Sequence, residues 1–302
     1  MKEINGVKIQ SKFKRALIKW KEKSLGVKIF LITFFLFFLI EAIIQLIPFV
    51  LLLNDSLKSF SEYSEYGSLK LTTGFVWENY SRVFSEFVVN GDVAYFGLLF
   101  NTLWQAILFV IVNLASSLMV SYSLAKFNFP GKGLLYGIMI FIQVIPIVGV
   151  GAAAYKLRYA LGMINNPGLL WVCWAVGFDY SAFVMYGTFR GVSDSYAESA
   201  EIDGANELTI FFKIMFPQIL PLALALSVDN FIARWNDYTT AQIDLPNFPT
   251  LSYGMFLFSS NMTTEKTVYF ASLVMAAIPG ILLYAFFQNF IIKNVSVGGI
   301  KG

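Results

Sequence analysis

Residues 193–205 read Ser-Asp-Ser-Tyr-Ala-Glu-Ser-Ala-Glu-Ile-Asp-Gly-Ala and lie between two apolar runs of the chain. Ser195 followed three residues later by Glu198 is the pattern of a capping box, so it predicts a helix that begins here. Gly204 predicts the end of that helix, because glycine readily adopts the left-handed conformation that closes many helices. Asn206 can cap a second helix. The apolar residues of that second helix follow at helical spacing: Leu208, Phe211, Phe212 and Met215.

The predicted motif is therefore a short helix, a glycine elbow and an amphipathic helix that lies against a bundle, with Pro217 at the start of the next apolar run. The carboxylates of Glu198, Glu201 and Asp203 could be recognised by basic residues of a partner protein. Small residues on the surface of the short helix would let it seat closely in a groove. On spacing alone, an ordinary surface loop is an equal alternative, with Glu198 serving only as a capping partner.

Long apolar runs make up most of the remaining chain. Of its 302 residues, 57% are hydrophobic and 14% are charged, whereas soluble domains contain about a quarter charged residues. The pattern predicts an all-α polytopic membrane protein with six transmembrane helices, two of which contain a proline expected to kink them, Pro146 and Pro279. The expected spans are Ile29–Leu53, Tyr95–Ala125, Leu134–Ala154, Gly168–Phe189, Gln218–Trp235 and Val268–Ile292.

The distribution of basic residues predicts the orientation. Residues 1–28 hold nine of the 22 Lys and Arg residues. Because six spans leave both termini on one side, 15 of the 22 would lie on the side of the N-terminus, which the positive-inside rule assigns to the cytoplasm. The expected divisions are a basic cytoplasmic segment (1–28), a first transmembrane helix (29–53), an external loop (54–94), a five-helix core with the cytoplasmic loop 190–217 (95–292) and a cytoplasmic tail (293–302). Residues 238–267 are expected to form a second external loop.

Several chemistries are excluded by composition. The chain contains no histidine, so a Ser-His-Asp triad and a His-ligated metal are both impossible. The single cysteine, Cys173, cannot form an intrachain disulfide. No phosphate-binding loop is present, because the nearest string, Phe129–Lys132, lacks its first glycine and its Ser or Thr. We therefore expect no catalytic residue, no cofactor, no metal and no nucleic acid, and any ATP hydrolysis must come from a partner.

Polar residues inside the predicted spans are candidates for a solute path, because they are costly in lipid. The path candidates are Glu41 in the first span and five further residues: Gln143, Asp179, Asp229, Asn230 and Trp235. Asp229, Asn230 and Trp235 could together offer hydrogen bonds and an aromatic platform to a sugar. Neighbouring residues on a helix point about 100° apart, however, so Asp229 and Asn230 need not face one lumen. Each candidate could instead join helices by hydrogen bonds.

A family resemblance decides between the two interpretations of the 193–205 stretch. The run Glu198-Ser199-Ala200-x-x-Asp203-Gly204-Ala205, with Phe211, Ile214, Phe216-Pro217 and Pro221 after it, resembles the "EAA" loop of ABC importer permeases. Ser199 replaces the middle alanine of that motif, and Phe216 replaces the leucine before its proline. The likeness runs from about residue 75 to the end of the chain. It includes Asn79-Tyr80, Val83-Phe84, Asn101-Thr102-Leu103, Phe127–Lys132, Trp235–Tyr238 and Gly298–Gly302.

These flanking motifs look like the carbohydrate branch, and the tail looks like that of the maltose-type permease that lacks the large periplasmic insertion. The resemblance implies a MetI-like permease core in the cell membrane, a second homologous permease, two copies of a cytoplasmic ATPase and an extracellular or lipoprotein solute-binding protein. It implies that a coupling helix contacts the ATPase through Glu198, Ala200, Glu201, Asp203, Gly204 and Ala205. It further implies that the tail residues Gly298, Gly299 and Lys301 touch the ATPase dimer.

Two rivals remain open at this point. A permease of another importer branch would move peptides, amino acids or ions. An ion-coupled secondary transporter would need no ATPase, but it gives no account of the Glu198–Pro221 pattern. An intramembrane enzyme is disfavoured by the missing histidines.

Overall fold

The structure is a computed structural model and describes residues 3–4, 7–8, 23–145, 151–175, 177–260 and 265–295. These residues are mainly helical, with two short antiparallel strand pairs, β1 (Glu3–Ile4) with β2 (Val7–Lys8) and β3 (Val88–Val89) with β4 (Val93–Ala94). The helices are α2 (Leu25–Ser56), α3 (Phe60–Tyr66), α4 (Glu78–Glu86), α5 (Tyr95–Lys126), α6 (Lys132–Val144), α7 (Gly151–Ala160), α8 (Pro167–Trp174), α9 (Tyr180–Gly191), α10 (Ser195–Ile202), α11 (Glu207–Ile210), the π-helical η1 (Phe211–Met215), α12 (Phe216–Trp235), α13 (Thr239–Ile243), α14 (Leu251–Ser260) and α15 (Lys266–Val295).

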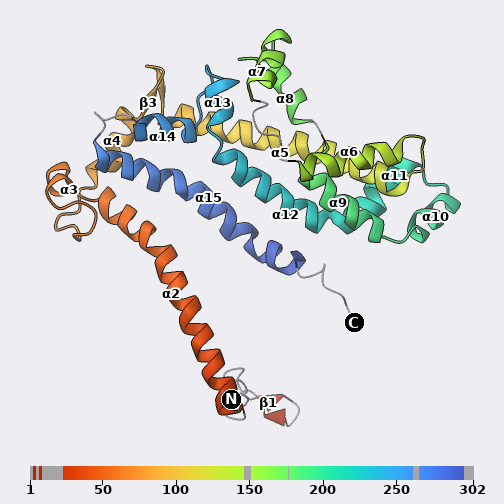
Figure 1. The fold of residues 1–302 in the computed structure, drawn as a ribbon, viewed down its shortest axis with the longest axis horizontal. Helices are drawn as coiled ribbons and strands as arrows, with labels where there is room; N and C mark the ends of the chain where they lie inside the picture. Colours follow the sequence, from red (N-terminus) through yellow and green to blue (C-terminus); the bar gives the residue numbers. More distant parts are fainter. Residues whose placement is uncertain are drawn as a thin grey trace.

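The body of the molecule is built around α5, which packs against α8, α9, α12 and α14, while α12 also packs against α15. Figure 1 shows α5, α12 and α15 running alongside one another between two ends. We call these ends the α10 end, which carries α9, α10 and α11, and the α14 end, which carries α4, β3 and α14. Among the described residues, three helical segments are long and apolar enough to cross a membrane: Leu25–Ser56, Tyr95–Lys126 and Glu207–Trp235.

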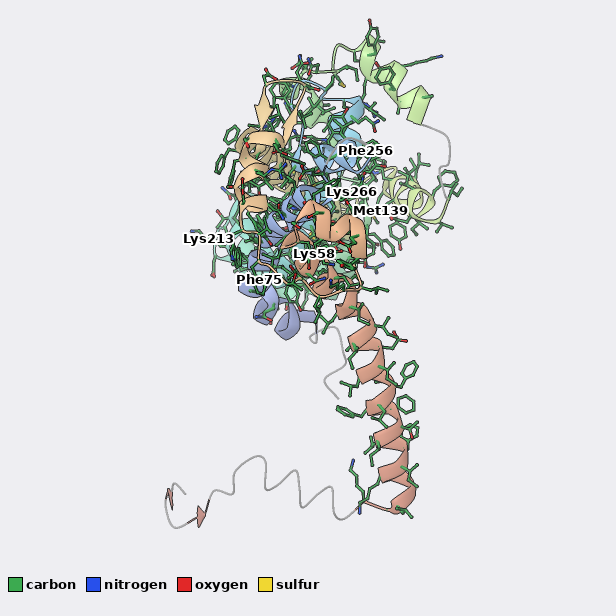
Figure 2. The ribbon with its side chains drawn as sticks, turned by 90° about the vertical axis from the view of Figure 1, so that its left-hand side faces the viewer. Lys58, Phe75, Met139, Lys213, Phe256 and Lys266 are labelled. Carbon is green, nitrogen blue, oxygen red and sulfur yellow. The ribbon has the colours of Figure 1, made fainter. Side chains whose placement is uncertain are left out.

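Helix α2 leaves the body at the α14 end, and its N-terminal part extends away from the other helices in both views (Figures 1 and 2). Its apolar side chains are exposed along almost the whole helix, and only its last residues, Asn54, Asp55 and Ser56, are buried. Lys58, labelled in Figure 2, is fully buried there; its Nζ donates to Asp55 Oδ1 (2.8 Å) and to the Gly67 carbonyl (2.6 Å). Buried polar contacts thus fix the C-terminal end of α2.

The α14 end is held by an apolar cluster that includes Val83 on α4, Phe87 directly after α4, Leu98 on α5 and Leu251 on α14. An ion pair also crosses it, because Arg82 Nη1 donates to Glu265 Oε2 (2.7 Å). This hydrogen bond holds the pKa of the Glu265 carboxyl below its ordinary value.

The predicted external loop 238–267 contains two helices, α13 and α14, and α14 is a packed part of the body. Helix α14 was not predicted because its ten residues are too few to span a membrane.

The third and fourth expected spans are not continuous helices. The third ends as α6 at Val144, and α7 begins again at Gly151; Pro146 lies outside the described residues. The fourth is divided into α8, which ends at Trp174, and α9, which begins at Tyr180. The expected spans Leu134–Ala154 and Gly168–Phe189 are therefore both interrupted, the third next to the proline that is expected to kink it.

Gly177 explains the break in the fourth span. Its φ is +64°, and a Cβ placed there would lie 2.8 Å from Val120 Cγ2 and 3.0 Å from the Ser116 carbonyl oxygen on α5. Only glycine allows both this conformation and so close an approach to α5. Asp179 then starts α9 by accepting a hydrogen bond from the Ala182 N–H (2.9 Å). Apolar composition alone could not reveal a break that a neighbouring helix imposes.

Candidate functional site

Helix α10 begins at Ser195 as predicted, but the predicted capping box does not form. The Glu198 N–H donates to the backbone carbonyl of Asp194 (3.0 Å), and no side chain caps this first turn. The Ser195 hydroxyl is instead paired with the Ser193 hydroxyl (2.8 Å), which also accepts a hydrogen bond from the Ser195 N–H (3.3 Å). The Ser195 hydroxyl, which the capping box needs, is therefore bonded to Ser193 and not to the backbone of the first turn.

The segment that leads into α10 is fastened to the end of α5. Lys126, the last residue of α5, donates from Nζ to the Val192 carbonyl and to Asp194 Oδ1, each at 2.6 Å. The Lys126 side chain is only 9% exposed, although Asp194 is largely in solvent. One buried ammonium group thus bridges both sides of Ser193, two residues before α10 begins.

The C-terminal end of α10 closes as a Schellman motif. Gly204 has a φ of +80°. The Ala205 N–H donates to the Ala200 carbonyl (2.9 Å), and the Gly204 N–H donates to the Glu201 carbonyl (3.0 Å). These are the 6→1 and 5→2 bonds of that motif. The predicted glycine elbow is therefore present, and it sets a fixed angle between α10 and the chain that follows.

The second helix of the loop begins as predicted, since the Asn206 side chain accepts a hydrogen bond from the Thr209 N–H (2.9 Å). It does not continue as a separate regular helix. Its chain passes through the π-helical turn η1, where the Phe216 N–H reaches the Phe211 carbonyl, directly into α12. Pro217 has no N–H to donate to the preceding turn, so the regular ladder is interrupted at this point.

The π turn also changes which side chains are buried. Ile210 and Met215 are buried, with Phe211 packed against them, but Leu208 and Phe212 are 69% and 61% exposed. The predicted apolar stripe assumed a regular helix throughout, whereas the π turn over residues 211–215 changes the angular spacing between the side chains before and after it. The prediction is therefore right for Phe211 and Met215 and wrong for Leu208 and Phe212.

The inner side of α10 seats on the body of the same chain. Ala200 is buried, and Ala197 and Ala205 pack around it in a cluster that contains Tyr122 of α5 and Phe189 of α9. The sequence analysis expected small residues on the outer surface of α10. The structure turns Ala200 inward, so its small size serves a close contact with this chain's own bundle.

The outer side of α10 combines acidic and apolar groups. Glu198, Glu201, Asp203 and Gly204 are all exposed, as is Glu207 on α11. Ile202 is 86% exposed between them, and Tyr196, Leu208 and Phe212 are also exposed. We call this set the outer surface of α10. An exposed isoleucine among carboxylates, on a helix with a fixed elbow, is suited to contact with another protein.

Two of the solute-path candidates join helices to one another. Asp179 accepts hydrogen bonds from Asn113 Nδ2 (2.9 Å) and Ser117 Oγ (2.8 Å) on α5. Asn230 on α12 donates to Asn113 Oδ1 and to Ser181 Oγ, each at 3.1 Å. Asp179 and Asn230 thus hold helices together by hydrogen bonds, which is the alternative to a role in the solute path. Their bonds connect α5, α9 and α12 near the break in the fourth span.

The remaining candidates lie elsewhere. Asp229 is exposed on α12 and Gln143 is exposed on α6, as is Glu41 on α2. Trp235 is buried and stacks on Phe231, with 5.8 Å between ring centroids. The structure therefore separates Asp229 from Asn230, as the 100° between neighbouring helix positions suggested, and does not gather the five candidates into one site.

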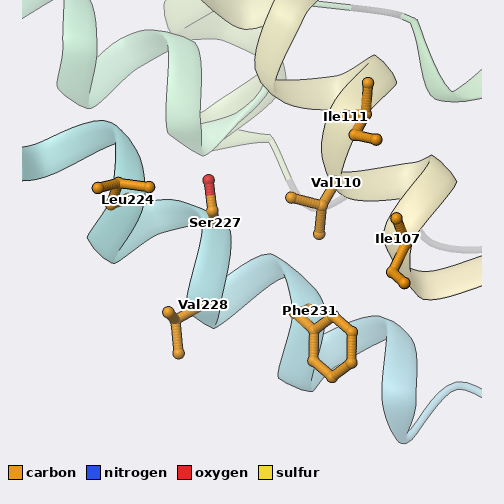
Figure 3. Close-up of a pocket in the computed structure, with 7 residues that line it drawn as sticks. All are labelled: Ile107, Val110, Ile111, Leu224, Ser227, Val228 and Phe231. Atoms are coloured by element: carbon orange, nitrogen blue, oxygen red, sulfur yellow. The ribbon is translucent and has the colours of Figure 1, made fainter. Parts of the chain in front are cut away.

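Two cavities adjoin α12. Figure 3 shows the first, of about 180 Å³, between α5 and α12; Ser227 is its one polar lining residue, and that hydroxyl already donates to the Ala223 carbonyl (2.8 Å). The second, of about 610 Å³, is lined by Trp235, Asn236, Tyr238 and Ser252 together with apolar side chains of α2, α12, α14 and α15. It offers several aromatic rings and hydrogen-bonding groups, whereas the first offers one ring, Phe231, and one hydroxyl that is already bonded.

Other predicted features cannot be placed. The tail residues Gly298, Gly299 and Lys301 lie outside the described residues. Within the part of the chain that the structure describes, no group of three or more metal-binding side chains is found. Cys173 is half-buried, and its thiol lies 3.5 Å from the Met163 sulfur.

The sequence analysis missed the role of Lys126 and Asn113. Lys126 is one of the basic residues expected on the cytoplasmic side, and Asn113 is one of three amides in the predicted second span. Their partners are 66 to 117 residues away along the chain. A polar residue inside or at the end of an apolar run was the available signal, but it did not indicate a partner.

Comparison with known proteins places this geometry in a family. The model of the binding-protein-dependent transport system inner membrane component matches residues 117–297. Two curated Bacillus subtilis relatives are each 28% identical to this chain. The arabinooligosaccharides transport system permease protein AraQ matches over 88% of this chain and 94% of its own length. The polygalacturonan/rhamnogalacturonan transport system permease protein YtcP matches over 88% and 96%.

A Streptomyces coelicolor relative, the diacetylchitobiose uptake system permease protein NgcG, is 26% identical over 86% of this chain and 85% of its own. The fold matches a crystal structure of a bacterial ABC transporter involved in the import of the acidic polysaccharide alginate. The TM-score is 0.72 at 24% identity, over 88% of this chain and 98% of the other. At that identity the structural match supports the fold alone. The family model covers more than half of the chain and all of α9 to α12, so this chain belongs to the family of binding-protein-dependent transport system inner membrane components.

Proposed function

We propose that this chain is the permease subunit of an ATP-binding-cassette importer that moves a carbohydrate, and an oligosaccharide in particular, across the cell membrane. Its family supports the importer class. The relatives AraQ, YtcP and NgcG are named for arabinooligosaccharides, polygalacturonan/rhamnogalacturonan and diacetylchitobiose, which supports the substrate class. The chain performs no chemistry in this proposal, and ATP is hydrolysed by partner subunits.

The observation that carries the proposal is the construction of α10. Its beginning is fastened by Lys126, its end is closed by the Schellman motif, and its inner side packs on the body. Its outer surface of carboxylates and apolar side chains is left for a partner. A short helix held this firmly can receive a displacement from an ATPase and pass it to the bundle as a rigid body.

The proposed assembly contains this chain, a second homologous permease, two copies of the ATPase and an extracellular or lipoprotein solute-binding protein. The N- and C-termini and α10 are cytoplasmic, and Gly298, Gly299 and Lys301 contact the ATPase dimer. ATP-driven closure of the ATPases brings the coupling helices together and turns the two permeases from inward-open to outward-open, when the loaded binding protein delivers its solute. The inward-open and outward-open states differ in the geometry of the ATPases. ATP can shift the equilibrium between these two states because it favours one of these geometries.

For the solute path, the cavity beside Trp235 is the better candidate of the two. A sugar presents hydroxyl groups that need hydrogen-bonding partners and a C–H face that packs on aromatic rings. Trp235, Asn236, Tyr238 and Ser252 supply both. Asp229, exposed on the same helix, is proposed to face the path, whereas Asp179 and Asn230 hold α5, α9 and α12 together.

The coupling role is tested in proteoliposomes that contain the purified complete importer. Glu198→Lys combined with Asp203→Lys should keep the complex assembled while lowering solute uptake at least about tenfold, within the usual range of coupling between sites. Gly204→Pro should do the same, because proline cannot adopt a φ of +80°. Glu78→Lys, which changes an exposed carboxylate of α4 at the opposite end, is the control and should leave uptake unchanged. Normal uptake by both coupling variants would refute the coupling role.

The substrate class is tested separately, with the cognate binding protein and a panel of arabino-oligosaccharides, maltodextrins, chitobiose, a peptide mixture and amino acids. We expect an oligosaccharide to bind and to stimulate ATP hydrolysis by the assembled importer. Preference for a peptide, an amino acid or an ion would retire the carbohydrate assignment and leave the importer class intact. Uptake by this chain without any ATPase would instead indicate a secondary transporter.

A further inference from the structure

We call residues 189–211, which contain α10 and the chain on each side of it, the coupling segment. Helix α5 contacts this segment on both sides of α10 through its last two turns. Lys126 holds Val192 and Asp194 just before α10. One turn earlier, the Tyr122 ring contacts Phe189, at the end of α9, and Phe211, beyond the elbow, with centroid distances of 5.3 and 4.8 Å. A displacement of α10 therefore acts on this end of α5 through the contacts of both Lys126 and Tyr122.

The other end of α5 is bonded to the segment that leads into α14. Asn101 Nδ2 donates to the Pro249 carbonyl (3.0 Å), and Gln105 Nε2 donates to the Phe248 carbonyl (2.9 Å). Thr102 Oγ1 accepts the Leu251 N–H (2.8 Å). Residues 248–251 are thus attached to α5 by three hydrogen bonds from about one turn of the helix. This segment runs directly into Ser252, which lines the cavity beside Trp235.

We infer that α5 is the rod that carries the movement of α10 to residues 248–251, and that Lys126 is the positioning residue that joins this rod to the coupling helix. The inference rests on the proposed coupling role of α10. Helix α5 is an unbroken helix of 32 residues, so it can transmit a displacement along its length. Two other routes lead away from α10. Helices α9 and α8 are separated by the break at Gly177 and cannot act as one rigid element, and α12 is reached from the elbow through the π turn η1 and not through a regular helix.

Lys126 is suited to this role because it makes a two-point contact that resists sliding. Its ammonium group reaches acceptors on both sides of Ser193, while the other contacts between α5 and the coupling segment are apolar and non-directional. Without that ammonium group, α10 keeps its apolar seat but can shift relative to α5. An arginine could reach the same two acceptors with its forked guanidinium, whereas a glutamine is shorter and uncharged.

The experiment measures ATP hydrolysed per solute imported by the complete importer in proteoliposomes, with the labelled oligosaccharide of the test panel that the wild type imports fastest. Lys126→Gln should raise this ratio roughly tenfold, because the ATPases continue to cycle while less of their movement reaches the far end of α5. Lys126→Arg should restore a ratio close to that of the wild type. Asp194→Asn should have a smaller effect, because the bond to the Val192 carbonyl remains.

Lys132→Gln is the matched control. Lys132 lies six residues further along the chain, and its Nζ bonds only near its own position, to the Phe127 carbonyl (2.8 Å) and Asn128 Oδ1 (3.3 Å). Its variant should leave the ratio unchanged. A folding defect lowers hydrolysis and import together, so it cannot produce the expected rise in the ratio. An unchanged ratio for Lys126→Gln, or an equal rise for Lys132→Gln, would overturn the inference.

The same assay separates this inference from the proposed function. If Gly204→Pro and the Glu198→Lys, Asp203→Lys pair uncouple the importer but Lys126→Gln does not, α10 is the coupling helix and α5 is not its rod. If none of these variants changes the ratio, the coupling role itself has failed.

Discussion

Helices α2 and α5 have the same length, 32 residues, and both are apolar, but they relate to the molecule in opposite ways. Helix α5 is packed along its length by α4, α6, α8, α9, α12 and α14. The apolar stretch of α2 has none of its residues buried within the chain. Helix α2 is in fact the more hydrophobic of the two, with a mean hydropathy of 2.6 against 2.0 in its apolar window. Hydrophobicity therefore does not decide which helix packs inside the bundle.

The difference lies in the buried polar residues of α5. Thr102, Gln105, Asn113 and Ser117 are all buried, and each makes a hydrogen bond to another helix or loop. In lipid, where apolar surfaces gain little by meeting each other, such bonds and close packing bring helices together. Along α2, comparable groups occur only at its C-terminal end. This end is where α2 is attached.

The attachment of α2 offers the largest effect. Lys58→Met should lower the unfolding free energy by about 3 to 5 kcal/mol, because it leaves the buried Asp55 carboxylate without its cation. Denaturant titration of the protein in mixed micelles measures this loss. The double variant Lys58→Met, Asp55→Leu should recover most of it, since no unpaired charge remains.

Lys70→Met is the control for that experiment. Lys70 lies over the exposed Tyr66 ring, 3.2 Å from its centroid, and should cost less than about 1 kcal/mol. Equal losses for Lys58→Met and Lys70→Met would show that the buried pair does not fasten α2.

A truncation on each helix tests the comparison directly. Leu98→Ala on α5 should cost about 2 to 4 kcal/mol, because Leu98 is fully buried in the cluster at the α14 end. Phe35→Ala on α2 removes a larger side chain that is 65% exposed and should change stability by less than about 0.5 kcal/mol. The same denaturant titration serves for both, and a loss at Phe35 comparable with that at Leu98 would contradict the unpacked state of α2 in the isolated chain.

The close approach of α5 to the break in the fourth span gives the smallest expected effect. Gly177→Ala should destabilise the protein by about 2 kcal/mol, because it combines a positive φ with contacts of 2.8 and 3.0 Å to α5. Gly187→Ala on α9 has open space around it and should be neutral or slightly stabilising. Thermal unfolding of the two variants in the same detergent compares them. Similar melting temperatures would mean that Gly177 does not approach α5 this closely.

The coupling segment shows how far the sequence could lead. Gly204, Asn206 and the start of α10 at Ser195 were predictable because caps and elbows depend on a few neighbouring residues. The absence of the capping box, the inward position of Ala200 and the exposure of Leu208 and Phe212 were not predictable. Those depended on competition from Ser193, on the packing of α10 against α5 and α9, and on the π turn before Pro217.

For the candidate solute path, the sequence identified polar residues in apolar runs but not what they do. Asp179 and Asn230 bond to residues 49 to 117 positions away, and Trp235 lines a cavity to which α2, α12, α14 and α15 contribute. The predicted fourth span contained Gly177, but nothing local shows that α5 approaches it closely. Such relations exist only when distant segments have packed.

By itself the sequence determined a helical membrane protein, the place of the coupling segment and its likeness to importer permeases, because apolar run length, capping and motif spacing are local properties of the chain. Tertiary structure alone decided that α2 is fastened only at its C-terminal end, that two spans are broken, and that Lys126 joins α5 to α10. Each of these depends on which buried polar group finds a partner, and that partner lies tens of residues away along the chain.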